Sequence, residues 1–221
     1  MAIRRIGTWN LNNQWSDEHG AFLRDQRCDV WLLTELKPRA VMSMRAAGLF
    51  CHCTSDFMAR KQHWAAVLST HPLTKRDDPH SASVAAVVNG ITFCSSILPW
   101  RGSGQHYSSL WGDKSLAEKM KATIDFLAAR LPRANLVWGG DWNQSLEGPI
   151  IGSKQGRSLI RLAAESLGLR VATADQVQHR ENGYYTIDHI AVPSAWKTKA
   201  ERIPAGRLSD HDAYVITVHE S

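Results

Sequence analysis

Short apolar runs bounded by polar turns recur along the chain, and their period indicates which segments are strands. Runs of about four to eight β-branched, aromatic or other apolar residues are typical of strands. Such runs predict strands over residues 3–9, 30–33, 63–69, 83–88, 91–97, 135–140, 170–173, 186–192 and 213–218. Asn89-Gly90 is a preferred two-residue hairpin turn, so we expect the strands on either side of it to pair antiparallel.

A spacing of three or four residues between apolar positions predicts helices in other segments. Leu116, Met120, Ile124 and Leu127, for example, fall on one helical face. Helices are predicted from Ser16 or Asp17 towards Arg27, and over residues 39–47, 116–131 and 158–167. Several predicted strands are joined by short turns, which disfavours a plain alternation of strands and helices around one parallel sheet. The pattern favours two packed sheets flanked by helices.

Polar side chains gather at the ends of the predicted strands, where α/β proteins place their chemistry. They are Asn10, Glu35, Asp141, Asn143, Asp188, Asp210 and His211. Three of these carboxylates adjoin strongly apolar runs, and burying a charge is costly unless a partner or a metal compensates it. A salt bridge or a helix cap explains any one of them alone. Taken together they favour a shared site for a hard cation such as Mg²⁺ or Mn²⁺, since few histidines accompany the oxygen donors.

Composition narrows the class of protein. The 221 residues are 43% hydrophobic and 21% charged, which predicts one globular domain over residues 1–221 and excludes a disordered chain or a coiled coil. The formal net charge of +5 suits a polyanionic partner. Neither an apolar run of membrane-spanning length nor a secretion signal is visible, so we expect a cytoplasmic protein, and a monomer. Four cysteines without disulfide or zinc spacing are expected to stay reduced.

Five short motifs occur in a particular order along the chain. They are Thr8-Trp9-Asn10-Leu11-Asn12, Leu33-Thr34-Glu35-Leu36-Lys37, Gly140-Asp141-Trp142-Asn143, Ile187-Asp188-His189-Ile190 and Ser209-Asp210-His211. In this order the chain resembles the endonuclease/exonuclease/phosphatase superfamily. The segment from Ala65 to Leu73 is similar to a further strand of that family. The resemblance implies a four-layer α/β sandwich with two mainly antiparallel sheets face to face and helices outside.

The resemblance also implies a role for each polar residue. Glu35 would be the principal metal ligand, with Asn10 and Asp210 near the same ion. Asp141 would orient or deprotonate the attacking water, and Asn143 would hold the phosphate or the nucleophile. His211 would contact the scissile phosphate while Asp188 bonds to its other ring nitrogen. An adjacent carboxylate favours the charged imidazole, which stabilises negative charge in the transition state.

The chain departs from the family pattern at the strand before Pro99. The family often places a histidine or tyrosine there, whereas Ser96 and Ile97 stand at this point. Neither can protonate a leaving group as histidine or tyrosine does. His106 and Tyr107 on the following loop are the candidates to replace the missing residue.

Five residues are candidate substrate contacts: Arg101, Trp142, Lys154, Arg157 and Tyr185. The loop from Trp100 to Tyr107 mixes a cation, glycines and aromatic residues, and Trp100, Trp111 and Trp142 are the tryptophans expected to stack on bases. The segment from Gly152 to Ser158 has glycines but not the spacing of an ATP-binding loop.

The favoured function is a Mg²⁺- or Mn²⁺-dependent phosphodiester hydrolase, most directly a nuclease with DNA as partner. One alternative is a phosphatase or phosphodiesterase of a small or lipid phosphate. The 5-phosphatase branch of the family usually carries Cys-Asp-Arg where Ile187-Asp188-His189 stands, which counts against it. A second alternative is a nucleic-acid-binding relative without catalysis, although clustered carboxylates that bind no cation would repel phosphate.

Overall fold

Two sheets face each other in the structure, a computed structural model that describes residues 2–58, 61–104, 110–177 and 184–219. The first sheet holds β1 (Arg5–Asn10), β2 (Val30–Leu36), β3 (Phe50–Cys53), β4 (Phe57–Met58), β5 (Gln62–Ser69), β12 (Lys197–Ile203) and β13 (Ala213–His219). The second holds β6 (Leu73–Lys75), β7 (Ser83–Val88), β8 (Ile91–Ser96), β9 (Leu136–Asp141), β10 (Leu169–Val171) and β11 (Asp188–Pro193). Their strand orders are β12-β13-β1-β2-β5-β3, with β4 beside β5, and β10-β11-β9-β8-β7-β6.

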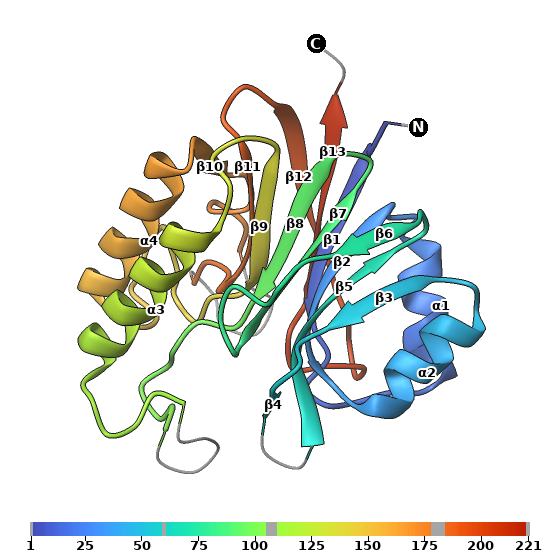
Figure 1. Cartoon of the computed structure of the whole chain (residues 1–221), viewed down its shortest axis with the longest axis horizontal. Coiled ribbons are helices and arrows are strands. Elements are labelled where there is room, and N and C mark those ends of the chain that lie inside the picture. Colours follow the sequence, from blue (N-terminus) through green and yellow to red (C-terminus); the bar gives the residue numbers. More distant parts are fainter. Residues whose placement is uncertain (1, 59–60, 105–109, 178–183, 220–221) are drawn as a thin grey trace.

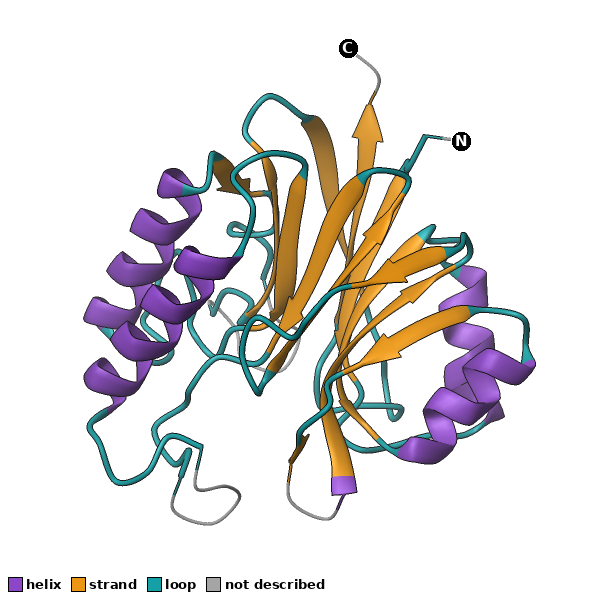
Figure 2. Cartoon of the chain, in the orientation of Figure 1, coloured by secondary structure: helices purple, strands orange, loops and turns teal. Residues whose placement is uncertain are grey.

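Helices cover the outer face of each sheet, which makes four layers. The helices α1 (Asp17–Asp25) and α2 (Pro38–Ala46) lie on the first sheet, and α3 (Leu116–Arg130) and α4 (Lys154–Ser166) on the second (Figures 1 and 2). Among the described strands, neighbours run antiparallel except in the pairs β1–β2 and β8–β9. The expected four-layer sandwich of mainly antiparallel sheets is confirmed.

The central strands are buried on both faces, because each contributes alternate side chains to two cores. In β2, Val30 and Leu32 point into the core between the sheets, whereas Trp31 and Leu33 pack under α1 and α2. Successive strand residues face opposite sides, so a continuous apolar run is what such a strand requires. This explains why the central strands were predicted correctly from the sequence.

Peripheral elements differ from the prediction. The strands β3, β4, β6 and β12 were not predicted, and each lies at or near a sheet edge, where one face meets solvent and the apolar signal weakens. The helix predicted from residue 158 begins at Lys154. Its first turn lacks apolar periodicity and is instead fixed by Ser153, whose side chain accepts a hydrogen bond from the backbone of Gly156 at 2.9 Å.

The sheet pairings bring one set of strand ends to a single edge of the sandwich. Because β1 and β2 are parallel, their C-terminal ends lie together, with Asn10 opposite Thr34. The antiparallel pairing of β9 and β11 places Asp141 opposite Asp188. Strand β13 runs antiparallel to β1, so the segment that leads into β13 reaches the same edge.

Close backbone approach at Gly140 sets the position of Asp141. A Cβ atom at Gly140 would lie 2.2 Å from the backbone oxygen of Ser96, and its φ is +120°. We therefore expect Gly140→Ala to destabilise the fold by about 3 kcal/mol or more, because both the contact and the dihedral are unfavourable. Gly90→Ala is the control, with a φ of +78° and nothing within 4 Å. It should cost about 1 kcal/mol. Equal losses of stability in urea unfolding would contradict this account.

Within the residues that the structure describes, no helix has the length and apolar character needed to cross a lipid bilayer.

Candidate active site

A polar cleft of about 470 Å³ opens where the central strands of both sheets end. Glu35, Asp141, Asn143 and His211 line it, which brings together residues that lie far apart in the sequence. Asn10 and Asp188 lie behind these residues, nearly inaccessible to solvent. The cleft has the volume of an ordinary small-ligand site.

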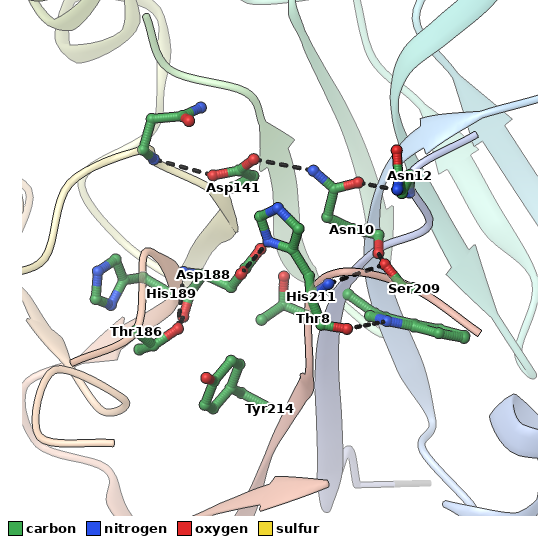
Figure 3. A network of polar contacts seen from close by, with 12 residues as sticks. Thr8, Asn10, Asn12, Asp141, Thr186, Asp188, His189, Ser209, His211 and Tyr214 are labelled. Carbon is green, nitrogen blue, oxygen red and sulfur yellow. Dashed lines mark hydrogen bonds and ion pairs between the residues drawn. The ribbon is translucent and has the colours of Figure 1, made fainter. Parts of the chain in front are cut away.

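Asn10 joins the two carboxylates of the cleft. Its side-chain nitrogen donates to Glu35 Oε1 at 3.0 Å and to Asp141 Oδ2 at 2.9 Å. Its oxygen accepts from the backbone of Asn12 at 2.8 Å (Figure 3). The amide thus presents donors to the carboxylates, and it would have to turn over to offer its oxygen to a cation beside Glu35.

His211 and Asp188 form the second part of the site. His211 Nδ1 lies 2.7 Å from Asp188 Oδ2 (Figure 3). Two contacts fix the His211 backbone: its N–H donates to Ser209 Oγ, and its oxygen accepts from Trp9 Nε1 at 3.0 Å. Since Nδ1 faces Asp188, Nε2 on the other side of the ring is available to a ligand in the cleft.

Burial and repulsion between carboxylates raise the pKa values of Asp141 and Glu35. The pKa of Asp141 rises to about 7, first because the side chain is buried and then because Asp188 is close. Burial likewise raises the pKa of Glu35, with Asn10 and His211 opposing the shift. Burial disfavours the imidazolium of His211, but Asp188, Asp141 and Asp210 outweigh it and raise its pKa to about 10. His211 is therefore cationic at neutral pH.

Glu35 is held in an uncommon backbone conformation by a neighbour that the sequence analysis missed. Its φ is +53° and that of Asn13 is +54°. The Asn13 backbone donates to the Glu35 oxygen at 3.1 Å, and its side chain donates to Glu35 Oε2 at 2.9 Å. Asparagine tolerates the left-handed region, so the consecutive asparagines after the first strand were a usable sequence signal.

The oxygen-rich donor set of the cleft fits a divalent cation. Ligand atoms of Asp141, Asp188 and His211 lie within 4.8 Å of one another, but His211 is protonated and bonded to Asp188, so it cannot donate a lone pair. Asp188 Oδ1 is buried without a hydrogen-bond partner among the described residues. The carboxylates of Glu35, Asp141 and Asp188 outnumber the imidazolium of His211. The atoms free to bind a cation are carboxylate oxygens, which suits Mg²⁺ or Mn²⁺.

Asn143 and Asp210 differ in their distance from the cleft. Asn143 lines the cleft. Its backbone N–H donates to Asp141 Oδ1 and its side-chain nitrogen donates to the Leu98 backbone oxygen, both at 3.0 Å. Asp210 is exposed and does not line the cleft, although its charge raises the pKa values of His211 and Glu35.

Two of the five candidate substrate contacts have structural roles in this conformation. Trp142 is fully buried, with its ring against Trp138 and His189, so its surface is closed to a ligand. The Arg157 guanidinium donates to the backbone oxygens of Ser145 and Pro149, among others, and thereby fixes the loop before α4. Neither role is predictable from the sequence, since both depend on packing against residues far along the chain.

The other three candidates lie at or near the surface. Arg101 is exposed on the turn after Trp100, and Lys154 is exposed at the start of α4. Tyr185 is half-buried, and its ring lies where a Cβ at Gly148 would be. His106 and Tyr107, the candidates for the leaving-group residue, lie outside the described residues.

The segment from Gly152 to Gly156 packs on a buried glutamine. A Cβ at either glycine would lie within 2.6 Å of the Gln144 side-chain oxygen. That oxygen accepts from the Ser153 backbone at 2.8 Å. The glycines therefore serve close packing of this segment.

Solved structures of low sequence identity share this fold. An AP endonuclease from Leishmania major superposes with a TM-score of 0.68 at 13% identity, over 99% of this chain and 88% of that one. A truncated TDP2 from Caenorhabditis elegans superposes with a TM-score of 0.61 at 12% sequence identity, over 98% of each chain. A mannosyl-6-phosphatase from Bacteroides thetaiotaomicron superposes with a TM-score of 0.64 at 11% sequence identity, over 98% of this chain and 100% of that one.

No curated protein matches the sequence. The family model described as the Endonuclease/Exonuclease/phosphatase family, however, matches residues 7–211. That range includes all five motifs and every residue of the cleft named above, and the chain therefore belongs to the Endonuclease/Exonuclease/phosphatase family.

Proposed function

We propose that the protein is a divalent-metal-dependent nuclease that hydrolyses phosphodiester bonds of DNA. Members of its family hydrolyse phosphoester bonds. The observation that carries the proposal is the pairing of a cationic His211, bound to Asp188, with the Glu35–Asn10–Asp141 network across one polar cleft. Such a site offers a cation-binding carboxylate, a base and a phosphate-binding imidazolium at once.

Asp141 is the group that takes the proton of the attacking water. Its burial and its nearness to Asp188 raise its pKa to about 7, which suits a base that works near neutral pH. Asn10 and the Asn143 backbone each donate to one of its oxygens and so fix the plane of the carboxylate. Asn143, which lines the cleft beside it, holds the phosphate or the water in place.

His211 stabilises the negative charge that develops on the phosphoryl oxygens. With Nδ1 bound to Asp188, Nε2–H donates to a non-bridging oxygen. Glu35 would hold the cation, with Asn10 after rotation of its amide and with the charge of Asp210 acting on the same site. A bound divalent cation stabilises charge on the phosphate and lowers the pKa of water.

Basic residues in the cleft and on the surface support nucleic acid as the substrate class. Lys37 lines the cleft, Arg101 and Lys154 are exposed, and the chain has a net charge of +5. A phosphate backbone meets several such cations at once, whereas a small phosphate ester meets one or two. The similarity in fold to the Leishmania AP endonuclease agrees with DNA as substrate.

The salt dependence of binding tests this substrate class. In Ca²⁺, the Asp141→Asn variant should bind a short DNA duplex with an affinity that falls linearly with salt on a log–log plot. The slope should be about −0.9 for each phosphate bound, because condensed cations leave the duplex. Replacing both Arg101 and Lys154 with glutamine should make the slope less negative by about 0.9 for each phosphate contact that is lost.

Lys121→Gln is the matched control, since Lys121 is exposed on α3 and pairs with Asp125. It should leave the slope unchanged. Weak binding without a salt slope, together with rapid hydrolysis of a small phosphate ester, would replace the nuclease by a phosphatase. Tight binding with no hydrolysis by the wild-type protein in Mg²⁺ or Mn²⁺ would instead support a non-catalytic nucleic-acid-binding protein.

A further inference from the structure

We propose that Trp100 is a specificity-determining residue that stacks on a nucleobase next to the scissile phosphate. This inference rests on the proposed nuclease function and adds the part of the nucleotide that the cleft recognises. It predicts that the protein distinguishes a strand that carries bases from an otherwise identical strand without them.

Both charged and apolar side chains line the cleft. Glu35, Asp141 and His211 are ionisable residues among them, and Met58, Ile97 and Trp100 are the apolar ones. A phosphate bound by His211 would place the adjoining nucleoside within the same cleft of about 470 Å³. A cleft that offers both ionic and apolar contacts suits a ligand with a charged part and a flat, weakly polar part.

Core contacts hold the Trp100 ring in place. The ring meets Trp111 edge to face, with centroids 5.6 Å apart at 79°, and Trp111 meets Trp64 in the same way at 5.4 Å and 73°. Trp111 and Trp64 are both buried, and Trp111 Nε1 donates to Thr123 Oγ1 at 3.0 Å. Trp100 is thus anchored to the core from behind while it borders the cleft.

The backbone of the Trp100 turn is braced independently. The Trp100 oxygen accepts from the Ser103 backbone at 3.0 Å and from its hydroxyl at 2.7 Å. The Ser103 oxygen in turn accepts from Nζ of Lys119, a buried lysine on α3. Because the ring is ordered before a ligand arrives, little conformational entropy is lost when a base stacks on it.

Their positions in the structure therefore distinguish the three tryptophans that the sequence suggested for base stacking. Trp142 is in the core, Trp111 packs against the Trp100 ring, and Trp100 alone among the three lines the cleft. Gln14 and Gln62, which line the same cleft, supply donors and acceptors for the edge of a base. These neighbours favour a nucleobase over an alkyl or sugar group in this cleft.

Binding to two oligonucleotides tests the proposal. One is a single strand of thymidines, and the other has the same length but carries tetrahydrofuran residues without bases. In the Asp141→Asn background with Ca²⁺, the base-bearing strand should bind about tenfold more tightly, since stacking on an aromatic ring gives effects of this size. Trp100→Ala should remove this difference, with the affinity for the baseless strand unchanged.

Further variants separate stacking from simple apolar contact. Trp100→Phe keeps a flat ring and should retain most of the preference, whereas Trp100→Leu keeps an apolar side chain without a ring and should behave like Trp100→Ala. Arg101→Gln on the same turn should weaken binding of both strands alike. In the catalytically intact protein, Trp100→Ala should raise KM for the base-bearing strand and leave kcat nearly unchanged.

Equal affinity of the two strands for the Trp100-containing protein, or an equal weakening of both on Trp100→Ala, would overturn the proposal. Tighter binding of the baseless strand would also overturn it. Failure of the proposed nuclease function is recognised separately, because it appears as the absence of hydrolysis and does not alter this binding comparison.

Discussion

Glu35→Gln is expected to lower kcat by about 10³-fold or more while the protein remains folded, because a metal-binding carboxylate contributes several kcal/mol to the transition state. The substitution keeps the side-chain volume and removes the negative charge. The affinity for Mn²⁺, measured by calorimetry, should fall in parallel. Stability should change little, since relief of the cost of burying the charge, and of the repulsion from Asp210 and Asp188, offsets the weakening of the hydrogen bonds that the carboxylate accepts.

Glu18→Gln is the matched control for this substitution. Glu18 forms an exposed ion pair with Arg207 at 2.6 Å, and pairs of this kind contribute little to stability. Its turnover and its Mn²⁺ affinity should equal those of the wild type. Normal turnover and normal metal affinity in Glu35→Gln would end the assignment of Glu35 as the principal ligand.

The pair Asp188 and His211 is expected to act as one unit. His211→Ala should lower kcat by about 10²- to 10³-fold, since it removes a donor to the developing charge. The double variant Asp188→Asn/His211→Ala should be little worse, because Asp188 contacts His211 at 2.7 Å and acts through it. Strictly additive effects in the double-mutant cycle would show that the two residues work separately.

Titration of His211 gives a second readout of the pair. Its pKa is raised to about 10 because Asp188, Asp141 and Asp210 outweigh the effect of burial. Removal of the Asp188 charge leaves burial less opposed, so the pKa in Asp188→Asn should fall towards or below the ordinary value of about 6.5. At pH 8, NMR should therefore find a charged ring in the wild type and a neutral ring in Asp188→Asn.

Edge elements show where sequence reasoning fails. Strand β12, Lys-Thr-Lys-Ala-Glu-Arg-Ile, has little apolar character, yet it pairs with β13 from Lys197 to Ile203. An ion pair between Arg5 and Glu201 joins it to β1. Strand formation there depends on the neighbouring strand rather than on local propensity.

The amino-acid sequence by itself determined the sandwich and most of the polar residues that meet at the candidate site. Both follow from local signals: continuous apolar runs form strands that are buried on both faces, and the polar residues that end those strands must share one edge when the strands pair. Tertiary structure alone decided the individual roles around the cleft. Whether Trp100, Trp142 or Arg157 lines the cleft depends on contacts with residues far away in the chain, and those contacts cannot be inferred from the period or spacing of residues in the sequence.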